Sequence, residues 1–232
     1  MNTKNSLNLY YSKIFFLRTE IDRLLALSMI FSIAMTVART IYSGHLTFLF
    51  LIWNLFLAWI PYCISQWLYY SQRKIKSKFV FVAALMVWLV FVPNTFYILT
   101  DLYHVGDDYN DFSMPQWFDL AMILSFAWNG LLLGILSVRH IEKIAHEKFR
   151  IRHELFFLYP TMWLNALGVY VGRYLRFNSW DLVSNPFHLV RDIADILFHP
   201  FSERYATGMI FCFSVLMTLI YLTLKKLSKA IR

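Results

Sequence analysis

The chain has 232 residues, of which 59% are hydrophobic and 16% are charged. A soluble domain of this length has no core large enough to bury so much apolar side chain, so the composition excludes an ordinary soluble protein and indicates a membrane protein. The net charge of +8 does not indicate a nucleic-acid-binding protein, because the aromatic residues fall in long apolar runs rather than between basic residues.

Six stretches are long and apolar enough to cross a bilayer as helices, for which about 20 residues are needed. The predicted spans are 24–42, 46–69, 79–99, 117–138, 155–175 and 206–224. The polar segment 1–23 comes before a long apolar run, so the first span is predicted to be retained rather than cleaved as a signal peptide. The predicted fold is an all-α bundle of six transmembrane helices in a lipid bilayer.

Lysine and arginine alternate between the connectors in the way expected of cytoplasmic loops. They concentrate in 1–23, 73–78, 139–152 and the tail 225–232, and are absent from 42–45 and 100–116. Both termini are therefore predicted to be cytoplasmic. Arg39, near the outer end of the first span, is predicted to extend its side chain to the membrane surface.

The outer connector between the fifth and sixth spans is predicted to contain an amphipathic helix over 186–199. Asn185 is suited to cap this helix, and Pro186 suits its first position. Polar residues repeat at helical spacing on one side and apolar residues on the other. Two locations stay open for it, the outer membrane surface and the ends of neighbouring spans.

Two GxxxG motifs occur, Gly130 with Gly134 in the fourth span and Gly168 with Gly172 in the fifth. Residues without side chains let helices approach closely in lipid. The two spans are predicted to pack against each other or against a third helix, within one chain rather than between two copies.

Polar residues inside the spans are costly in lipid, so their positions carry the functional hypothesis. Asn94, Tyr97, Asp101 and His104 fall on one face of the third span if that helix continues to His104. Pro93 is expected to open this helix locally. The halves of the spans nearer the cytoplasm are almost entirely apolar, which places the polar stripe toward the outer surface.

Asp101 needs a positive partner, because a helix C-terminus disfavours a carboxylate. Arg173 or Arg176 would supply that partner in an ion pair, and a metal ion or cationic ligand is the functional alternative. Asp101 and His104, together with Asp107 and Asp108, give a donor set that a divalent metal could use. Such a metal is the one cofactor that the sequence suggests.

Two further predictions complete the candidate site. Arg173 and Arg176, with the turn from Asn178 to Asp181, are predicted to bind a phosphate or carboxylate group. Asp119 lies in the first turn of the fourth span, where it either caps the helix or joins Asp101 and His104 as an acid, a base or a metal ligand.

Several segments resemble one family of bacterial membrane proteins. They are PNTFYILTDLYH (93–104), WFDL (117–120) and GVYVGRYLRFNSWD (168–181), which occur in the same order in the family called domain of unknown function 1361. The resemblance covers about residues 50 to 220. It implies a bacterial multi-pass protein, hence the cytoplasmic membrane, and brings no reaction, substrate or cofactor.

Three functions stay open at this point. The first is an outward-facing pocket that binds or processes a lipid-linked or phosphate-bearing ligand. The second is an accessory or assembly subunit that binds another membrane protein, and the third is a small-solute transporter. The sequence does not decide whether the protein is an enzyme.

Overall fold

A computed structural model describes residues 17–72, 74–105, 114–149, 153–177, 186–199 and 203–230. All regular structure in these ranges is helical. The elements are α2 (Glu20–Ser43), α3 (Phe50–Ser71), α4 (Lys78–Phe91), α5 (Pro93–Tyr97), the 3-10 helix η1 (Ile98–His104), α6 (Gln116–Phe149), α7 (Glu154–Arg173), α9 (Pro186–Phe198) and α10 (Arg204–Ala230).

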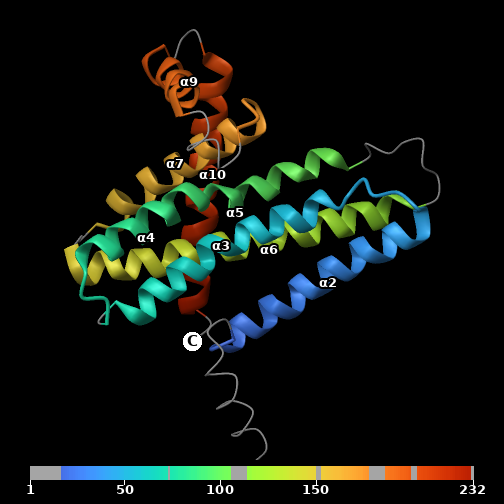
Figure 1. The fold of residues 1–232 in the computed structure, drawn as a ribbon, viewed down its shortest axis with the longest axis horizontal. Helices are drawn as coiled ribbons and strands as arrows, with labels where there is room; N and C mark the ends of the chain where they lie inside the picture. The colour runs from blue at the N-terminus through green and yellow to red at the C-terminus, as the bar shows by residue number, and fades with distance from the viewer. Residues whose placement is uncertain are drawn as a thin grey trace, which may run out of the picture.

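Six helical segments are long and apolar enough to cross a membrane, with α4, α5 and η1 counted as one. The predicted all-α bundle of six spans is therefore confirmed. α3 and α6 pack against each other through the centre, α2 packs on α6, and α7 pairs with α10. α9 lies apart, near the end of α7 and the start of α10 (Figure 1).

Two helices extend well beyond the predicted spans. α6 continues to Phe149 and α10 to Ala230, so residues expected in a cytoplasmic loop and tail lie on helices instead. The predicted limits followed hydrophobicity, whereas Lys, Arg and Glu are good helix formers and allow a span to continue into water. Arg139, Glu142 and Lys225 are thereby placed on helix faces that can pack.

α2 joins the bundle through polar contacts rather than through a leucine-rich face. Thr19 and Asp22 form a capping box at its start, and Asn129 Nδ2 of α6 donates to Ser32 Oγ over 2.9 Å. The prediction for Arg39 is wrong: its side chain is 1% exposed and turns inward. A buried carboxylate, Asp119 of α6, compensates the charge that would otherwise draw this side chain to the surface.

The third span is broken where Pro93 was expected to open it. α4 ends at Phe91, α5 begins at Pro93, and the chain continues as a 3-10 helix from Ile98. Side chains of the break satisfy the freed carbonyls: Asn94 Nδ2 donates to the oxygen of Phe91 over 2.9 Å, and Thr95 Oγ1 to that of Val92 over 2.7 Å. A non-regular backbone is thus tolerated inside the bundle.

Both GxxxG motifs pack on this broken segment, from two sides. A Cβ added at Gly130 would lie 2.7 Å from the backbone oxygen of Thr95, and one added at Gly168 would lie 2.5 Å from Cγ of Pro93. The third-helix alternative is therefore the observed one, and the third helix is α5. The close approach of α6 and α7 to α5 fixes the part of the chain that carries Tyr97 and Asp101.

α9 agrees with the predicted amphipathic helix, although its expected cap, Asn185, lies outside the described residues. Ile196 is buried, while Phe187 and Phe198 are 88% and 78% exposed. Packing and exposed apolar surface therefore occur on the same helix.

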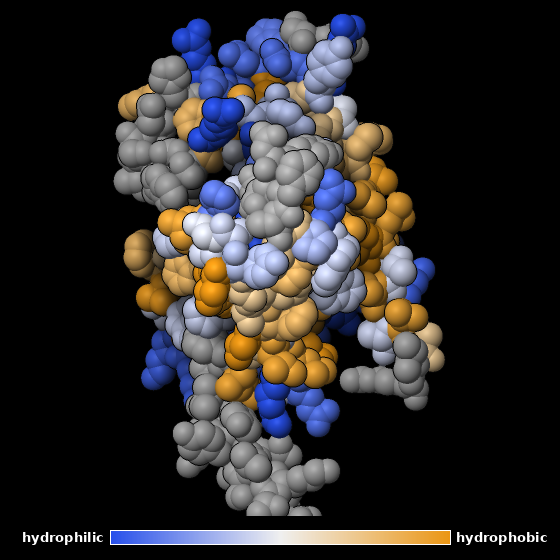
Figure 2. Space-filling model, turned by 90° about the vertical axis from the view of Figure 1, so that its right-hand side faces the viewer, coloured by the Kyte–Doolittle hydropathy of each residue, from blue (hydrophilic) through white to orange (hydrophobic). Residues whose placement is uncertain are grey.

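Figure 2 shows the end of the bundle on the right of Figure 1, with polar residues toward the middle and apolar residues along the right and lower margins.

Candidate functional site

A buried polar group joins α3, the third span and α7. Asp101 is fully buried, and Asn54 Nδ2 of α3 donates to its Oδ2 over 2.8 Å. Its Oδ1 lies 3.6 Å from Arg173 Nη1, an ion pair without a hydrogen bond. We call Asn54, Tyr97, Asp101, His104 and Arg173 the Asp101 cluster. The positive partner that Asp101 was expected to need is Arg173, the last residue of α7.

Arg173 is held by aromatic and imidazole groups as well as by Asp101. Its Nη2 lies 2.9 Å from His104 Nε2, which is the acceptor because a guanidinium only donates. Its Nη1 donates to the Tyr97 hydroxyl over 3.5 Å, and its Cζ lies 5.7 Å from the ring centre of Tyr103. The side chain keeps 17% of its surface exposed, so it is positioned without being sealed in.

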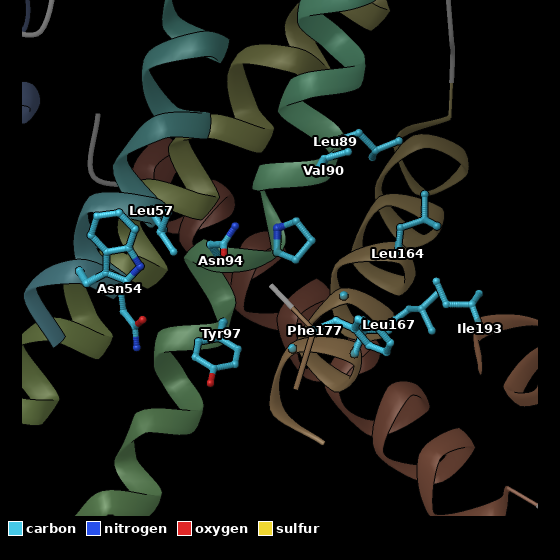
Figure 3. Close-up of a pocket in the computed structure, with 15 residues that line it drawn as sticks. Asn54, Leu57, Leu89, Val90, Asn94, Tyr97, Leu164, Leu167, Phe177 and Ile193 are labelled. Atoms are coloured by element: carbon cyan, nitrogen blue, oxygen red, sulfur yellow. The ribbon is translucent and has the colours of Figure 1, made fainter. Parts of the chain in front are cut away.

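The Asp101 cluster borders a cavity of about 280 Å³, which we call the Tyr97 cavity. Its walls come from α3, α4, α5 and α7. Phe177, which follows α7, and Ile193 of α9 complete the lining. In Figure 3 the polar ends of Asn54 and Tyr97 point away from Leu89 and Val90, which mark the other end. The cavity therefore has a polar end at Asn54 and Tyr97, where Arg173 contacts the Tyr97 hydroxyl from outside the lining, and an apolar remainder.

The chain after α7 turns back on this cavity at Arg176. That residue has a φ of 59°, a left-handed conformation that costs a non-glycine residue about 1 kcal/mol. The Phe177 amide donates to the Val171 oxygen over 3.3 Å, which closes the end of the helix. Phe177 is thereby placed in the cavity wall, while the Arg176 side chain is exposed.

Asp119 serves a different part of the molecule. Its two carboxylate oxygens accept hydrogen bonds from Arg39 Nε over 2.7 Å and Nη2 over 3.2 Å. Cζ of Arg39 in turn lies 4.3 Å from the ring centre of Phe48. Such a buried, two-bonded ion pair stabilises the contact between α2 and α6. Asp119 was expected either to cap the helix or to join Asp101 and His104, and instead it forms this ion pair with Arg39.

The structure thus brings together most of the predicted site. Asn94 and Tyr97 line the cavity, and Asp101, His104 and Arg173 meet at its polar end. Arg176 lies on the exposed turn and Asp119 in the ion pair with Arg39.

Four residues of the earlier interpretation lie outside the described part of the chain: Asp107, Asp108, Asn178 and Asp181. Among the described residues, no group of three His, Cys, Asp or Glu side chains is arranged to hold a metal. The metal hypothesis depends on Asp107 and Asp108 and stays a prediction.

Sequence reasoning missed a second buried ionic group, at the opposite end of the helices. Glu142 of α6 is fully buried and accepts from Lys225 Nζ over 2.6 Å, Tyr221 Oη over 2.7 Å and Arg139 Nη1 over 2.8 Å. Lys225 also pairs with Glu154 at the start of α7. We call these five residues the Glu142 cluster. The sequence gave little signal, because Glu142 stands among the basic residues Arg139 and Lys143, in a stretch that was assigned to a cytoplasmic loop.

A third polar group corrects the expectation that this half of the bundle is almost entirely apolar. Asp22 is buried and accepts hydrogen bonds from Tyr62 and from Gln66 Nε2, while Ser65 Oγ lies 3.3 Å from His140 Nδ1. The sequence does not reveal this group, because Asp22 was assigned to the segment before the first span and its partners Tyr62 and Gln66 are 40 and 44 positions away. The polar partners meet only once α2, α3 and α6 are packed.

Comparison with known proteins gives a family and no function. No curated protein and no solved structure matches the chain. A family model described as "Protein of unknown function (DUF1361)" matches residues 53–223, from the first turn of α3 to near the end of α10, and leaves α2 outside. The match covers most of the membrane domain and the whole Asp101 cluster, and the chain therefore belongs to the DUF1361 family.

Proposed function

We propose that this membrane protein binds a lipid with an anionic phosphate headgroup, with the headgroup at Arg173 and the start of the hydrocarbon chain in the Tyr97 cavity. The observation that carries the proposal is the position of one fixed guanidinium at the polar end of an apolar cavity within the membrane domain. An amphipathic ligand needs both features next to each other.

Arg173 is suited to the headgroup. A guanidinium has five N–H donors in a planar fork that matches phosphate, and two of its nitrogens make the contacts described here. His104 and Tyr97 would keep this fork in place through hydrogen bonds, while Asp101, held by Asn54, lies 3.6 Å away as the counter-charge. Asp101 also reduces the local positive charge, which favours a singly or partly charged headgroup over a dense cluster of phosphates.

The cavity is suited to a chain that enters from the bilayer. Trp53 and Leu164 line it and are 51% and 41% exposed, although both lie within candidate spans. Exposed apolar residues at that depth face lipid. A hydrocarbon chain can therefore pass from the bilayer into the cavity without crossing water.

The charge distribution of the loops supports an outer location for this site. The Asp101 cluster lies at the end of the bundle whose connectors, 42–45 and 100–116, contain no Lys or Arg. By the positive-inside rule that end faces away from the cytoplasm. The ligand would then belong to the outer leaflet of a bacterial cytoplasmic membrane.

Of the other functions, the accessory-subunit hypothesis is weakened because both GxxxG faces are occupied by α5. Solute transport gains some support from the buried polar groups at both ends of the bundle. Transport of a polar solute requires a hydrated route between those ends. Substrate-dependent flux in proteoliposomes would favour it over lipid binding.

A titration of the detergent-purified protein with undecaprenyl phosphate, undecaprenol and inorganic phosphate tests the proposal. Wild type is expected to bind undecaprenyl phosphate, and Arg173→Gln to bind it at least about tenfold more weakly, which corresponds to ~1.4 kcal/mol. Arg176→Gln is the matched control, since this exposed arginine is three residues away, and its affinity should change by less than about twofold.

Two results would contradict the proposal. One is an Arg173→Gln protein that binds undecaprenyl phosphate as well as wild type does. The other is equal binding of undecaprenol, which would show that the phosphate contributes nothing.

A further inference from the structure

A second cavity of about 300 Å³ lies between α4, α6 and α7, on the side of the Glu142 cluster. We call it the Phe157 cavity. Phe81, Ile144 and Phe157 are typical of its lining, and the hydroxyl of Thr161 donates within its own helix, to the oxygen of Phe157 over 2.7 Å. The polar atom nearest the cavity is thus already bonded, and the space suits hydrocarbon rather than a polar solute.

The Phe157 cavity and the Tyr97 cavity meet at Leu89, which lines both. On α7 the lining residues Phe157, Thr161, Leu164 and Gly168 recur every three or four positions, and Gly172 continues the series. At 3.6 residues per turn these positions fall within about 80 degrees of one another on a single helix face. The two cavities are consequently aligned along the same side of α7, with Leu89 in the wall of both.

Together the two cavities extend over a length that exceeds the hydrocarbon depth of one leaflet. From Phe157 to Gly172 the α7 axis covers ~22 Å at 1.5 Å per residue. Half of the hydrocarbon core of a bilayer measures only ~15 Å. A chain that begins at Arg173 and follows this face of α7 to Phe157 would pass the middle of the membrane.

We propose that the two cavities form one crevice that holds a single long hydrocarbon chain of the polyprenyl type, with the side chain of Leu89 turned aside. The proposal rests on the proposed headgroup site at Arg173, and it names the class of chain attached to that headgroup. A peptide is a poor occupant, because its backbone N–H and C=O groups would be left unpaired along the apolar walls.

Leu89→Trp tests the proposal by filling the junction. Two ligands with the same headgroup are compared, undecaprenyl phosphate and the short-chain farnesyl phosphate. The variant is expected to bind undecaprenyl phosphate about tenfold more weakly than wild type and farnesyl phosphate within about twofold of wild type. Val87→Trp is the control, since Val87 is on the same helix, is 46% exposed and lines neither cavity, so it should discriminate against neither ligand.

A second measurement uses the unaltered protein and so does not depend on the folding of a variant. A polyprenyl phosphate with a photoreactive group at the tail end is expected to label residues of the Phe157 cavity, such as Phe81 and Phe157. Labels confined to lipid-facing residues of other helices would overturn the proposal.

The outcomes separate this proposal from the one on which it rests. If wild type binds both phosphates but Leu89→Trp affects both equally or neither, the single crevice is refuted and the headgroup site stands. If wild type binds neither phosphate, the headgroup site is refuted, and the long-chain proposal with it.

Discussion

Asp101 and Glu142 are both fully buried carboxylates in the same bundle, yet their surroundings differ. Glu142 accepts three hydrogen bonds of 2.6 to 2.8 Å from Arg139, Tyr221 and Lys225. Asp101 accepts one, from Asn54, and its other oxygen lies 3.6 Å from Arg173. The first carboxylate has its acceptor positions well used, whereas the second does not.

The difference indicates two different roles. A buried charge that is fully hydrogen-bonded holds elements together, and the Glu142 cluster ties α10 to α6 and α7 in this way. A buried charge with an unused acceptor, beside a cavity and a partly exposed guanidinium, is typical of a binding site. We therefore expect the Glu142 cluster to stabilise the bundle, and we propose ligand binding only for the Asp101 cluster.

The largest expected effect is a loss in the free energy of unfolding when Glu142 is replaced. Glu142→Gln leaves Lys225 and Arg139 without their shared buried counter-charge, and should lower the free energy of unfolding by about 3 kcal/mol. Denaturant unfolding in detergent measures this change. The protein that remains folded should still bind undecaprenyl phosphate.

Glu147→Gln is the control for that variant. Glu147 is one turn further along α6, exposed, and bonded only to Gln72 Nε2 among the contacts described. Its loss should cost less than about 0.5 kcal/mol. A loss of similar size in both variants would remove the special role given to Glu142.

A middle-sized effect is expected where α7 packs on α5. A Cβ at residue 168 would lie 2.5 Å from the rigid ring of Pro93, so Gly168→Ala should destabilise the protein by about 2 kcal/mol through overpacking. It should also weaken ligand binding, because Arg173 is placed by this contact. Thermal unfolding and the same lipid titration measure the two effects.

Gly208→Ala is the matched control, since nothing lies within 4 Å of a Cβ built there. That variant should be as stable as wild type or slightly more stable, because alanine is the better helix former. If both variants lose equal stability, the close packing of α7 on α5 does not matter.

Among the variants of the two clusters and their packing, the smallest loss of stability is expected at Asp101. Asp101→Asn removes one charge-assisted hydrogen bond and a long ion pair, so it should cost only about 1 kcal/mol. Affinity for undecaprenyl phosphate should rise, because the negative charge nearest to Arg173 is gone. A large loss of stability with no change in affinity would place Asp101 in the same class as Glu142.

Much of the fold could be predicted from the sequence, because the signals were local. Long apolar runs gave the six spans, Pro93 gave the break in the third span, and the GxxxG motifs gave the close contacts. Asp101, His104 and Arg173 were also found, since they cluster near the ends of apolar runs where polar residues are conspicuous.

The remaining parts required knowledge of packing. Arg39 was expected at the surface because its partner, Asp119, is 80 positions away in the sequence. Glu142 was assigned to a loop because the polar residues that follow it hid the continuation of α6. Pairs of this kind are fixed only when distant helices meet, and single-residue hydrophobicity carries no information about them.

The central claim is that the Glu142 cluster stabilises the bundle whereas the Asp101 cluster binds the ligand. Comparing variants of one basic residue from each cluster tests this claim most directly. Thermal unfolding of wild type, Arg173→Gln and Lys225→Gln is measured with and without undecaprenyl phosphate, since a ligand present at 100 times its dissociation constant stabilises the native state by about 2.7 kcal/mol. We predict that Arg173→Gln loses the ligand-induced shift, measured against the same variant without ligand, whereas Lys225→Gln is less stable than wild type and keeps the shift. Two variants that lose the shift equally, or that both keep it, would contradict the account.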